Sequence, residues 1–175
     1  IENSKNGNLD IIYLLAADEF EVDKLSNSFI IYQGHHGDIG AKNADVILPG
    51  AAYTEKNATY VNLEGKVQRG SKSTFPPNEA REDWTIIRAL SAEINAQIPF
   101  DNIVELRQLM ESEYPVFSKI DLFQSQEWKS IGTDGLINND SLEVPIRDFY
   151  MTNPITRASH TMSLCKSEYD NRISN

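Results

Sequence analysis

The segment from Tyr32 to Gly40, YQGHHGDIG, contains residue types that often carry chemistry. His35 and His36 could supply imidazole ligands to a metal ion, and Asp38 could supply a carboxylate. Adjacent side chains point in different directions on a strand or helix, so both rings reach one ion only from an unusual loop. We therefore expect a hydrogen-bonded pair of loop histidines rather than a metal site.

Glycine occurs at every third position of this segment, at Gly34, Gly37 and Gly40. This spacing differs from the dinucleotide-binding pattern of glycines and from the P-loop, which ends in Gly-Lys-Ser/Thr. Phosphate binding is therefore only weakly indicated. The pattern is typical of backbone with positive φ, where a strand leaves its sheet.

Two acidic residues, Glu55 and Glu64, lie close to Lys56 and Lys66. Nothing in their spacing distinguishes one carboxyl group as an acid and the other as a base. The alternation of charges instead predicts a solvated or ion-paired hairpin.

The remaining reactive side chains are also isolated. His160 lies in a predicted tail helix and is expected at a surface or an interface, and Cys165 is expected to be a small buried residue of that helix. A single cysteine cannot supply the roughly four thiolates that hold an iron–sulfur cluster. We expect no catalytic, cofactor-binding or metal-binding residues in this chain.

Composition excludes several classes of partner. The chain has 175 residues, 40% of them apolar and 24% charged, with a net charge of −10 that would repel nucleic acid and anionic membranes. No apolar run approaches the roughly 20 residues that span a bilayer, and the first residues lack a signal-peptide pattern. Because the sequence begins at Ile1 without methionine, we expect a part upstream of it.

Short apolar segments predict a sheet that positions the histidine and glycine residues described above. Segments 11–17 and 29–33 are short apolar runs rich in β-branched residues and are predicted to be buried parallel strands. Segment 45–49 is predicted to be a third short strand, which Pro49 stops. The segment 58–68 loosely resembles a hairpin with its turn at Gly65.

Two helices are expected to follow the strands. Prolines and then acidic residues begin the segment 76–94, and its apolar side chains recur at helical spacing. The face predicted to pack on the sheet contains Trp84, Ile87, Leu90 and Ile94. Asp101 is predicted to cap a second helix that Pro115 ends. The apolar residues of that helix are Ile103, Leu106, Leu109 and Met110.

A tail helix is predicted near the C-terminus, with Asn153 as its N-cap and Pro154 at its first position. Its apolar stripe, which needs a surface to cover it, comprises Ile155, Ala158, Met162, Cys165 and Tyr169. The sequence thus predicts an α/β fold of short parallel strands with flanking helices over residues 1–115. An irregular connection over 116–147 and a helical C-terminal tail over 148–175 follow.

Several long motifs carry a family resemblance. YQGHHGD, GAKNADVILPGAAYTEKNATYVNLEGKVQ, AREDWTIIRALS, DFYMT and RASHTM resemble the C-terminal part of the large iron–sulfur subunits, or G subunits, of NADH:quinone oxidoreductase, respiratory complex I. More broadly, the long central motif resembles the molybdopterin oxidoreductases, which implies the C-terminal part of their α/β domain over residues 1–115. Ala58 and Lys66 depart from the glycine and arginine usual there, and the complex I branch generally lacks a molybdenum cofactor.

The resemblance implies a non-catalytic, structural part of a subunit that supports electron transfer from NADH to quinone. It implies 2Fe–2S and 4Fe–4S clusters in a preceding N-terminal region and contacts with other subunits of the peripheral arm. It also implies a place peripheral to the inner membrane, on its cytoplasmic side in a bacterium or its matrix side in a mitochondrion. The alternative is part of an active molybdopterin-dependent oxidoreductase resembling formate dehydrogenase.

Overall fold

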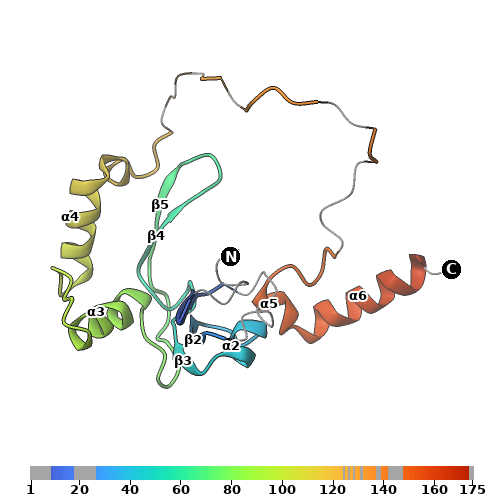
Figure 1. Cartoon of the computed structure of the whole chain (residues 1–175), viewed down its shortest axis with the longest axis horizontal. Coiled ribbons are helices and arrows are strands. Elements are labelled where there is room, and N and C mark those ends of the chain that lie inside the picture. Colours follow the sequence, from blue (N-terminus) through green and yellow to red (C-terminus); the bar gives the residue numbers. More distant parts are fainter. Residues whose placement is uncertain are drawn as a thin grey trace. The chain divides into compact units, whose positions relative to one another are not determined.

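The structure is a computed structural model of the chain. It describes residues 9–17, 27–123, 125, 127, 129–130, 132–136, 139–141 and 148–173. The chain divides into two compact units, residues 1–123 and 124–175 (Figure 1).

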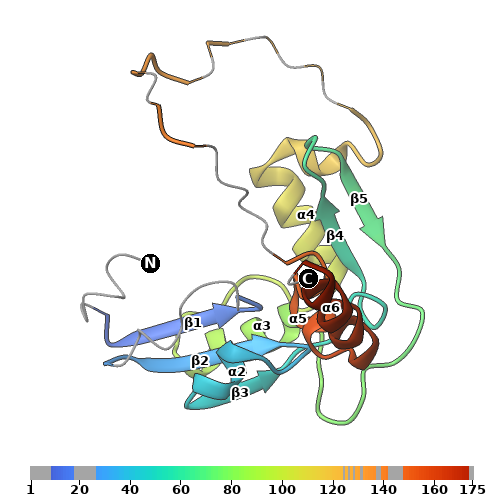
Figure 2. The ribbon, with the colours of Figure 1, turned by 90° about the vertical axis from the view of Figure 1, so that its right-hand side faces the viewer.

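A parallel sheet of three strands begins the first unit. Its strands are β1 (Ile11–Leu15), β2 (Phe29–Gly34) and β3 (Val46–Pro49), in the order β1-β2-β3. Both neighbouring pairs are parallel, and Figure 2 shows the strands side by side. The three predicted strands and their parallel pairing are therefore confirmed. Their predicted burial is wrong at the strand ends, since Ile11, Leu15 and Phe29 are 64%, 51% and 46% exposed. The carboxyl ends of all three strands meet at one edge of the sheet, where the His35–His36 loop begins.

The core of this sheet is small and centred on β2. Leu14, Ile30 and Tyr32 are 4%, 5% and 2% exposed and form one apolar cluster. The short helix α2 (Ile39–Asn43) adds Ala41 to this cluster. Complete burial of such side chains contributes about 1.5–3 kcal/mol each, so the cluster fixes the position of β2.

The predicted hairpin is present. Strands β4 (Ala58–Val61) and β5 (Val67–Gly70) pair antiparallel, and Gly65 in the turn has a φ of 80°. That conformation is strained for residues with a side chain, which explains glycine there. Val67 is 1% exposed and forms an isolated bridge with Ile120, so a later segment covers β5.

The first predicted helix begins later than its prolines and is only partly buried along its predicted face. Helix α3 (Asp83–Glu93) begins well after the two prolines. Ile87 and Ile94, two members of the predicted face, are 37% and 63% exposed, whereas Ser91 is 6% exposed. The Ser91 hydroxyl oxygen accepts a hydrogen bond from the backbone amide of Ile98 at 3.3 Å. The chain thus turns back over Ser91, and the predicted sheet-packing face is wrong at two positions.

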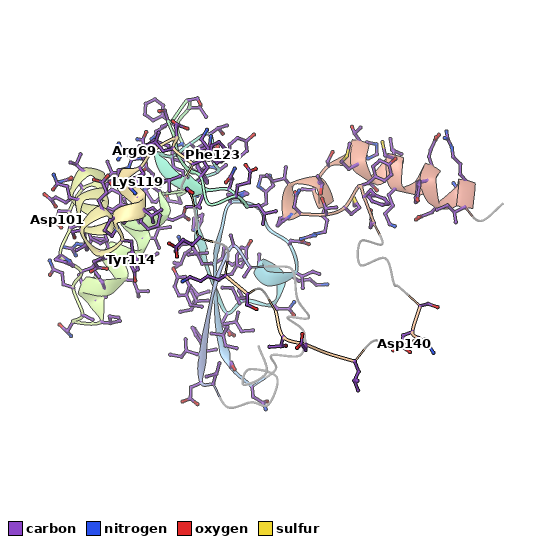
Figure 3. All side chains as sticks on the ribbon, turned by 90° about the horizontal axis from the view of Figure 1, so that it is seen from above. Arg69, Asp101, Tyr114, Lys119, Phe123 and Asp140 are labelled. Carbon is purple, nitrogen blue, oxygen red and sulfur yellow. The ribbon has the colours of Figure 1, made fainter. Side chains whose placement is uncertain are left out.

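The second helix, α4 (Ile103–Glu113), has its cap one residue later than predicted. The Asn102 side chain accepts hydrogen bonds from two first-turn amides and is the N-cap. Asp101 instead pairs with Arg88, at 2.6 Å between Nη2 and Oδ1. The 3-10 turn η2 (Pro115–Ser118) follows directly, so proline ends the helix as predicted. Figure 3 labels Asp101 and Tyr114 near the two ends of α4.

The second unit contains helices α5 (Pro154–Arg157) and α6 (His160–Ile173). Asn153 caps α5 in a capping box, as predicted. The single predicted helix is nevertheless divided, because the Ser159 hydroxyl oxygen accepts a 3.4 Å hydrogen bond from an amide in the first turn of α6. Serine in this role starts a new helix and interrupts the predicted apolar stripe.

Helix α6 is held by the segment that precedes α5. The Tyr169 ring contacts the rings of Phe149 and Tyr150, with centroids 6.4 and 6.0 Å away. Lys166 Nζ pairs with Asp148 Oδ2 at 3.1 Å, and hydrogen bonds from the Tyr150 amide and from Lys166 lower the pKa of Asp148. Among the described residues, no helix combines the length and the apolar character needed to cross a membrane.

Candidate functional site

The histidine pair lies in the loop after β2. His35 Nδ1 and His36 Nδ1 are 2.7 Å apart, and the rings meet edge to face with centroids 4.9 Å apart. A hydrogen bond between these atoms requires one nitrogen with a hydrogen and one without. Each ring therefore uses its Nδ1 for the other ring.

The electrostatic surroundings keep His35 neutral at pH 7. Its pKa is lowered from 6.5 by burial first, then by His36 and by the cation of Lys56, while Asp83 and Glu55 act in the opposite direction. Within the part of the chain that the structure describes, no three His, Cys, Asp or Glu side chains form a group that could hold a metal ion.

Gly34 is needed for space and not for an unusual φ. The Tyr32 ring folds back across the Gly34 backbone, and its hydroxyl donates to the His36 carbonyl oxygen at 2.9 Å. A Cβ at position 34 would lie 2.7 Å from Cζ of that ring, well inside contact distance. The expectation of positive φ at Gly34, Gly37 and Gly40 is wrong, since among the described residues the glycines with positive φ are Gly65 and Gly132.

A chain of hydrogen bonds lies beside this loop, formed by Tyr13, Gln33, Asp83 and Lys56, and we call it the Gln33–Asp83 clamp. Gln33 is fully buried, at 0% exposure, at the carboxyl end of β2. Its Oε1 accepts from the Tyr13 hydroxyl, and its Nε2 donates to Asp83 Oδ1 at 2.9 Å. Asp83 Oδ2 forms an ion pair with Lys56. The clamp joins β1, β2, the start of α3 and the segment before the hairpin.

The clamp depends on close backbone approach and on burial. A Cβ at Gly50 would lie 2.9 Å from Asp83 Oδ1, so glycine lets the carboxylate reach Gln33. Burial, followed by the charge of Asp83, raises the pKa of Tyr13 above its ordinary value of 10.0. Tyr13 is consequently a neutral hydrogen-bond donor near pH 7. Both carboxylate oxygens of Asp83 have partners, and the buried Gln33 amide uses its oxygen and nitrogen.

Both lysines of the predicted charged hairpin form ion pairs, with partners from later segments. Lys56 pairs with Asp83, and Lys66 pairs with Asp121 at 3.4 Å. Glu55 Oε2 accepts a hydrogen bond from the Ala52 backbone amide at 2.9 Å and closes a turn. Glu64 Oε2 accepts from the Asn62 side chain at 3.3 Å on the exposed hairpin turn. These contacts place Glu55 and Glu64 in separate structural roles.

His160 and Cys165 both lie on α6, in the second unit. His160 is the first residue of the helix and is exposed. Cys165 is a free, half-buried cysteine beside Tyr169. The structure therefore places neither of them in the same unit as the His35–His36 loop.

A cavity of about 380 Å³ adjoins the His35–His36 loop. Its lining contains two carboxylates, Glu55 and Glu79, and no lysine or arginine. Two carboxylates with no cation in the lining itself disfavour an anionic group such as a pyrophosphate. The chemistry of this lining fits a structural loop better than a phosphate-binding loop.

Asp83 and Gln33 are the site residues that the sequence did not reveal. Asp83 has the usual position of an acidic residue in a first helical turn, and Gln33 ends an apolar strand. The signal available in the sequence was an amide side chain near the carboxyl end of an apolar strand. Such a group, once buried, needs hydrogen-bond partners from other segments. Its partner lies fifty residues further along the chain, which local spacing does not indicate.

Two family models match the chain. The molybdopterin oxidoreductase family model matches residues 1–93, and the model of the C-terminal part of the NADH-ubiquinone oxidoreductase G subunit matches residues 116–165. The first match contains the parallel sheet and its loops, and the second contains α5 and the start of α6.

Curated relatives are similar over nearly the whole chain. The 75 kDa subunit of NADH-ubiquinone oxidoreductase from Reclinomonas americana is 46% identical over 90% of this chain and 23% of its own length. The 78 kDa mitochondrial subunit from Candida albicans is 47% identical over 93% of this chain and 24% of its own length. The G subunit of NADH-quinone oxidoreductase from Rickettsia felis is 42% identical over 94% of this chain and 24% of its own length.

The chain thus spans about a quarter of the length of these relatives. Its parallel sheet with flanking helices agrees with the α/β fold of the matching family. The chain belongs to the molybdopterin oxidoreductase family, and its relatives are the NADH-quinone oxidoreductase subunits named G, 75 kDa or 78 kDa.

Proposed function

We propose that this chain is a non-catalytic, structural part of the large iron–sulfur subunit of NADH:quinone oxidoreductase. The Gln33–Asp83 clamp is the observation that supports the proposal most strongly. Open α/β sheets bind ligands at the carboxyl ends of their strands, and here the polar groups at that edge bind one another. Groups that already have protein partners position segments rather than reacting atoms.

The proposed role belongs to an assembly. The single cysteine does not fit the ligand set of an iron–sulfur cluster, so the 2Fe–2S and 4Fe–4S clusters that the subunit would carry are held by other residues. Other peripheral-arm subunits are the proposed partners, at a site peripheral to the inner membrane. In a bacterium this site is on the cytoplasmic side, and in a mitochondrion on the matrix side.

Within this role, we assign the parts of the chain as follows. Residues 1–115 form the supporting α/β domain, residues 116–147 a connection, and residues 148–175 a helical tail. Each of the two end parts keeps its own internal contacts, such as the clamp in the first and the pairing of Lys166 with Asp148 in the last.

A variant of Asp83 in the full-length subunit tests the structural role. Asp83→Ala removes the carboxylate that joins Gln33 to Lys56, and the expected result is less assembled complex with unchanged NADH:quinone turnover per assembled complex. Asp10→Ala is the control, because it removes an exposed carboxylate from the same unit. Normal assembly combined with a large loss of turnover per complex would contradict a structural role.

The family match over residues 1–93 favours one alternative, an active molybdopterin-dependent oxidoreductase. The carboxylate-lined cavity beside the His35–His36 loop does not fit its anionic, phosphate-bearing cofactor. Elemental analysis of the full-length subunit separates the two functions. Stoichiometric molybdenum would support the alternative, and iron without molybdenum would support the structural role.

A further inference from the structure

A second cavity in the first unit, of about 260 Å³, lies between β4, the start of α3 and α4. Figures 1 and 2 both show α4 beside the β4–β5 hairpin. Arg69 of the hairpin, labelled in Figure 3, pairs with Glu111 of α4 at 2.8 Å and fixes this spacing. The cavity is separate from the one beside the His35–His36 loop.

The walls of this cavity are mostly apolar. Helix α4 contributes residues three, four and seven positions apart, which lie on one face of a helix. Those that line the cavity are Ile103, Leu106, Arg107 and Met110. Tyr60 from β4 and Trp84 from α3 add aromatic surface opposite them. Such walls suit an apolar body, and above all a flat aromatic one.

Arg107 brings an unsatisfied donor to this apolar wall. Its Nε is buried and has no hydrogen-bond partner. None of the ion pairs found among the described residues involves Arg107. Leaving a charged donor buried without a partner costs more than leaving a neutral one, so the position favours an added acceptor with a negative charge.

The acidic residues of the cavity are already occupied. Glu82 accepts from Trp84 Nε1 at 3.1 Å and lies 3.9 Å from Lys72, and Asp83 belongs to the clamp. Arg107 is therefore the lining cation whose charge no ion pair of the described residues offsets. The two carboxylates nearby disfavour a doubly charged phosphate, whereas a single carboxylate matches the planar guanidinium fork.

From this geometry we propose that the cavity between β4 and α4 binds a carboxylate carried on an apolar, preferably aromatic, body, with Arg107 as its partner. The ligand is a free carboxylic acid or the side chain of an acidic residue next to an aromatic one in a polypeptide. The proposal is independent of the structural role of the clamp, because it concerns Arg107 and leaves the Asp83 contacts in place.

The test uses the 175-residue chain labelled with ¹⁵N, in which the Arg107 Nε–H signal reports directly on the cavity. The probes are 3-phenylpropionate, its neutral amide, and the capped dipeptides acetyl-Phe-Glu-amide and acetyl-Phe-Gln-amide. We expect a charged probe to shift the Arg107 signal and to bind about tenfold or more tightly than its neutral counterpart. Binding of the free acid points to a small-molecule ligand, and binding of the dipeptide alone points to a polypeptide.

Arg107→Gln should abolish the preference for the charged probe, and Arg107→Lys should restore only part of it, because lysine lacks the planar fork. Arg172→Gln is the control, since that side chain is 81% exposed on α6 and should leave binding unchanged. The proposal is overturned if no charged probe binds, if acid and amide bind equally, or if Arg107→Gln binds like the original chain. The comparison of acid with amide decides the matter even if a variant of Arg107 does not fold.

Discussion

At the residue scale, the central feature is a fully buried amide and not the histidine pair. Gln33 links the Tyr13 hydroxyl to the Asp83 carboxylate, and both links cross between segments far apart in sequence. A buried polar group contributes little when it is paired but costs about 1–3 kcal/mol when its partner is removed. Gln33 therefore specifies which segments meet at the carboxyl edge of the sheet.

Replacing Gln33 should consequently destabilise the first unit. Gln33→Leu keeps the volume but leaves the Tyr13 hydroxyl and Asp83 without an amide partner, and we expect a loss of about 1–3 kcal/mol in unfolding free energy. Urea denaturation followed by circular dichroism measures this loss. Gln68→Leu makes the same exchange at an exposed position of β5 and should change stability by less than about 0.5 kcal/mol. Equal effects at both positions would rule out the clamp.

His35 gives the first unit a pH dependence of defined sign. Its folded pKa lies below 6.5, so the unfolded chain binds a proton at a higher pH than the folded chain does. Stability is fully present above about pH 6.5 and falls as the pH decreases through and below that value. Denaturation at pH values of about 7.5 and 5.5, on either side of the ordinary histidine pKa of 6.5, should show the decrease, and His35→Gln should reduce it. His160→Gln in the second unit should leave it unchanged, and the opposite slope in the original chain would show that the lowered pKa is wrong.

At the element scale, the hairpin β4–β5 shows how a distant segment decides burial. Val67 begins β5 and is 1% exposed, whereas its registered partner Val61 on β4 is 52% exposed. The bridge from Val67 to Ile120 explains the difference, because residues after α4 cover the start of β5. The hairpin is thus fixed at one end by a distant segment.

This asymmetry predicts unequal effects of the same substitution. Val67→Ala removes buried methyl groups and should cost about 1–3 kcal/mol of unfolding free energy. Val61→Ala should cost less than about 0.5 kcal/mol, because that side chain is largely exposed. Chemical denaturation of both variants compares them directly. A larger cost at Val61 would mean that the covered end of the hairpin is assigned wrongly.

The elements also show how far sequence patterns extend. The parallel strands, the hairpin turn at Gly65 and the capping by Asn153 were predictable, because each depends on local periodicity or on one local backbone requirement. Which residues of the predicted face of α3 become buried was not predictable, since Ser91 is buried through a contact with Ile98 beyond the helix. The break before α6 depends on the Ser159 hydroxyl, which competes locally with a continuous helix.

The candidate site was predictable only in its location. The residues between β2 and α2 were correctly identified as a loop, although Gly40 lies in α2. Gly34, the last residue of β2, has to make room for Tyr32 instead of adopting a positive φ. The partner of Gln33 comes from the start of α3, and only the folded chain brings Asp83 to it. Contacts between distant segments have no local periodicity from which a single sequence could predict them.

At the scale of the whole molecule, the chain consists of two compact units, and the ion pairs Lys56–Asp83 and Lys166–Asp148 each lie within one unit. It spans about a quarter of the length of relatives that are named as subunits of an NADH-quinone oxidoreductase. We propose a supporting role for this quarter, in which its reactive-looking residues hold the fold and do not take part in the redox reaction.

The most direct measurement is NADH:quinone turnover per assembled complex after both loop histidines are changed to glutamine in the full-length subunit. A supporting role predicts unchanged turnover, because His35 and His36 bind each other and border a cavity lined by carboxylates. The amount of assembled complex and its iron content serve as internal controls. A loss of about 100-fold or more, the usual effect of removing a catalytic acid or base, in a complex with normal assembly and normal iron would contradict the supporting role.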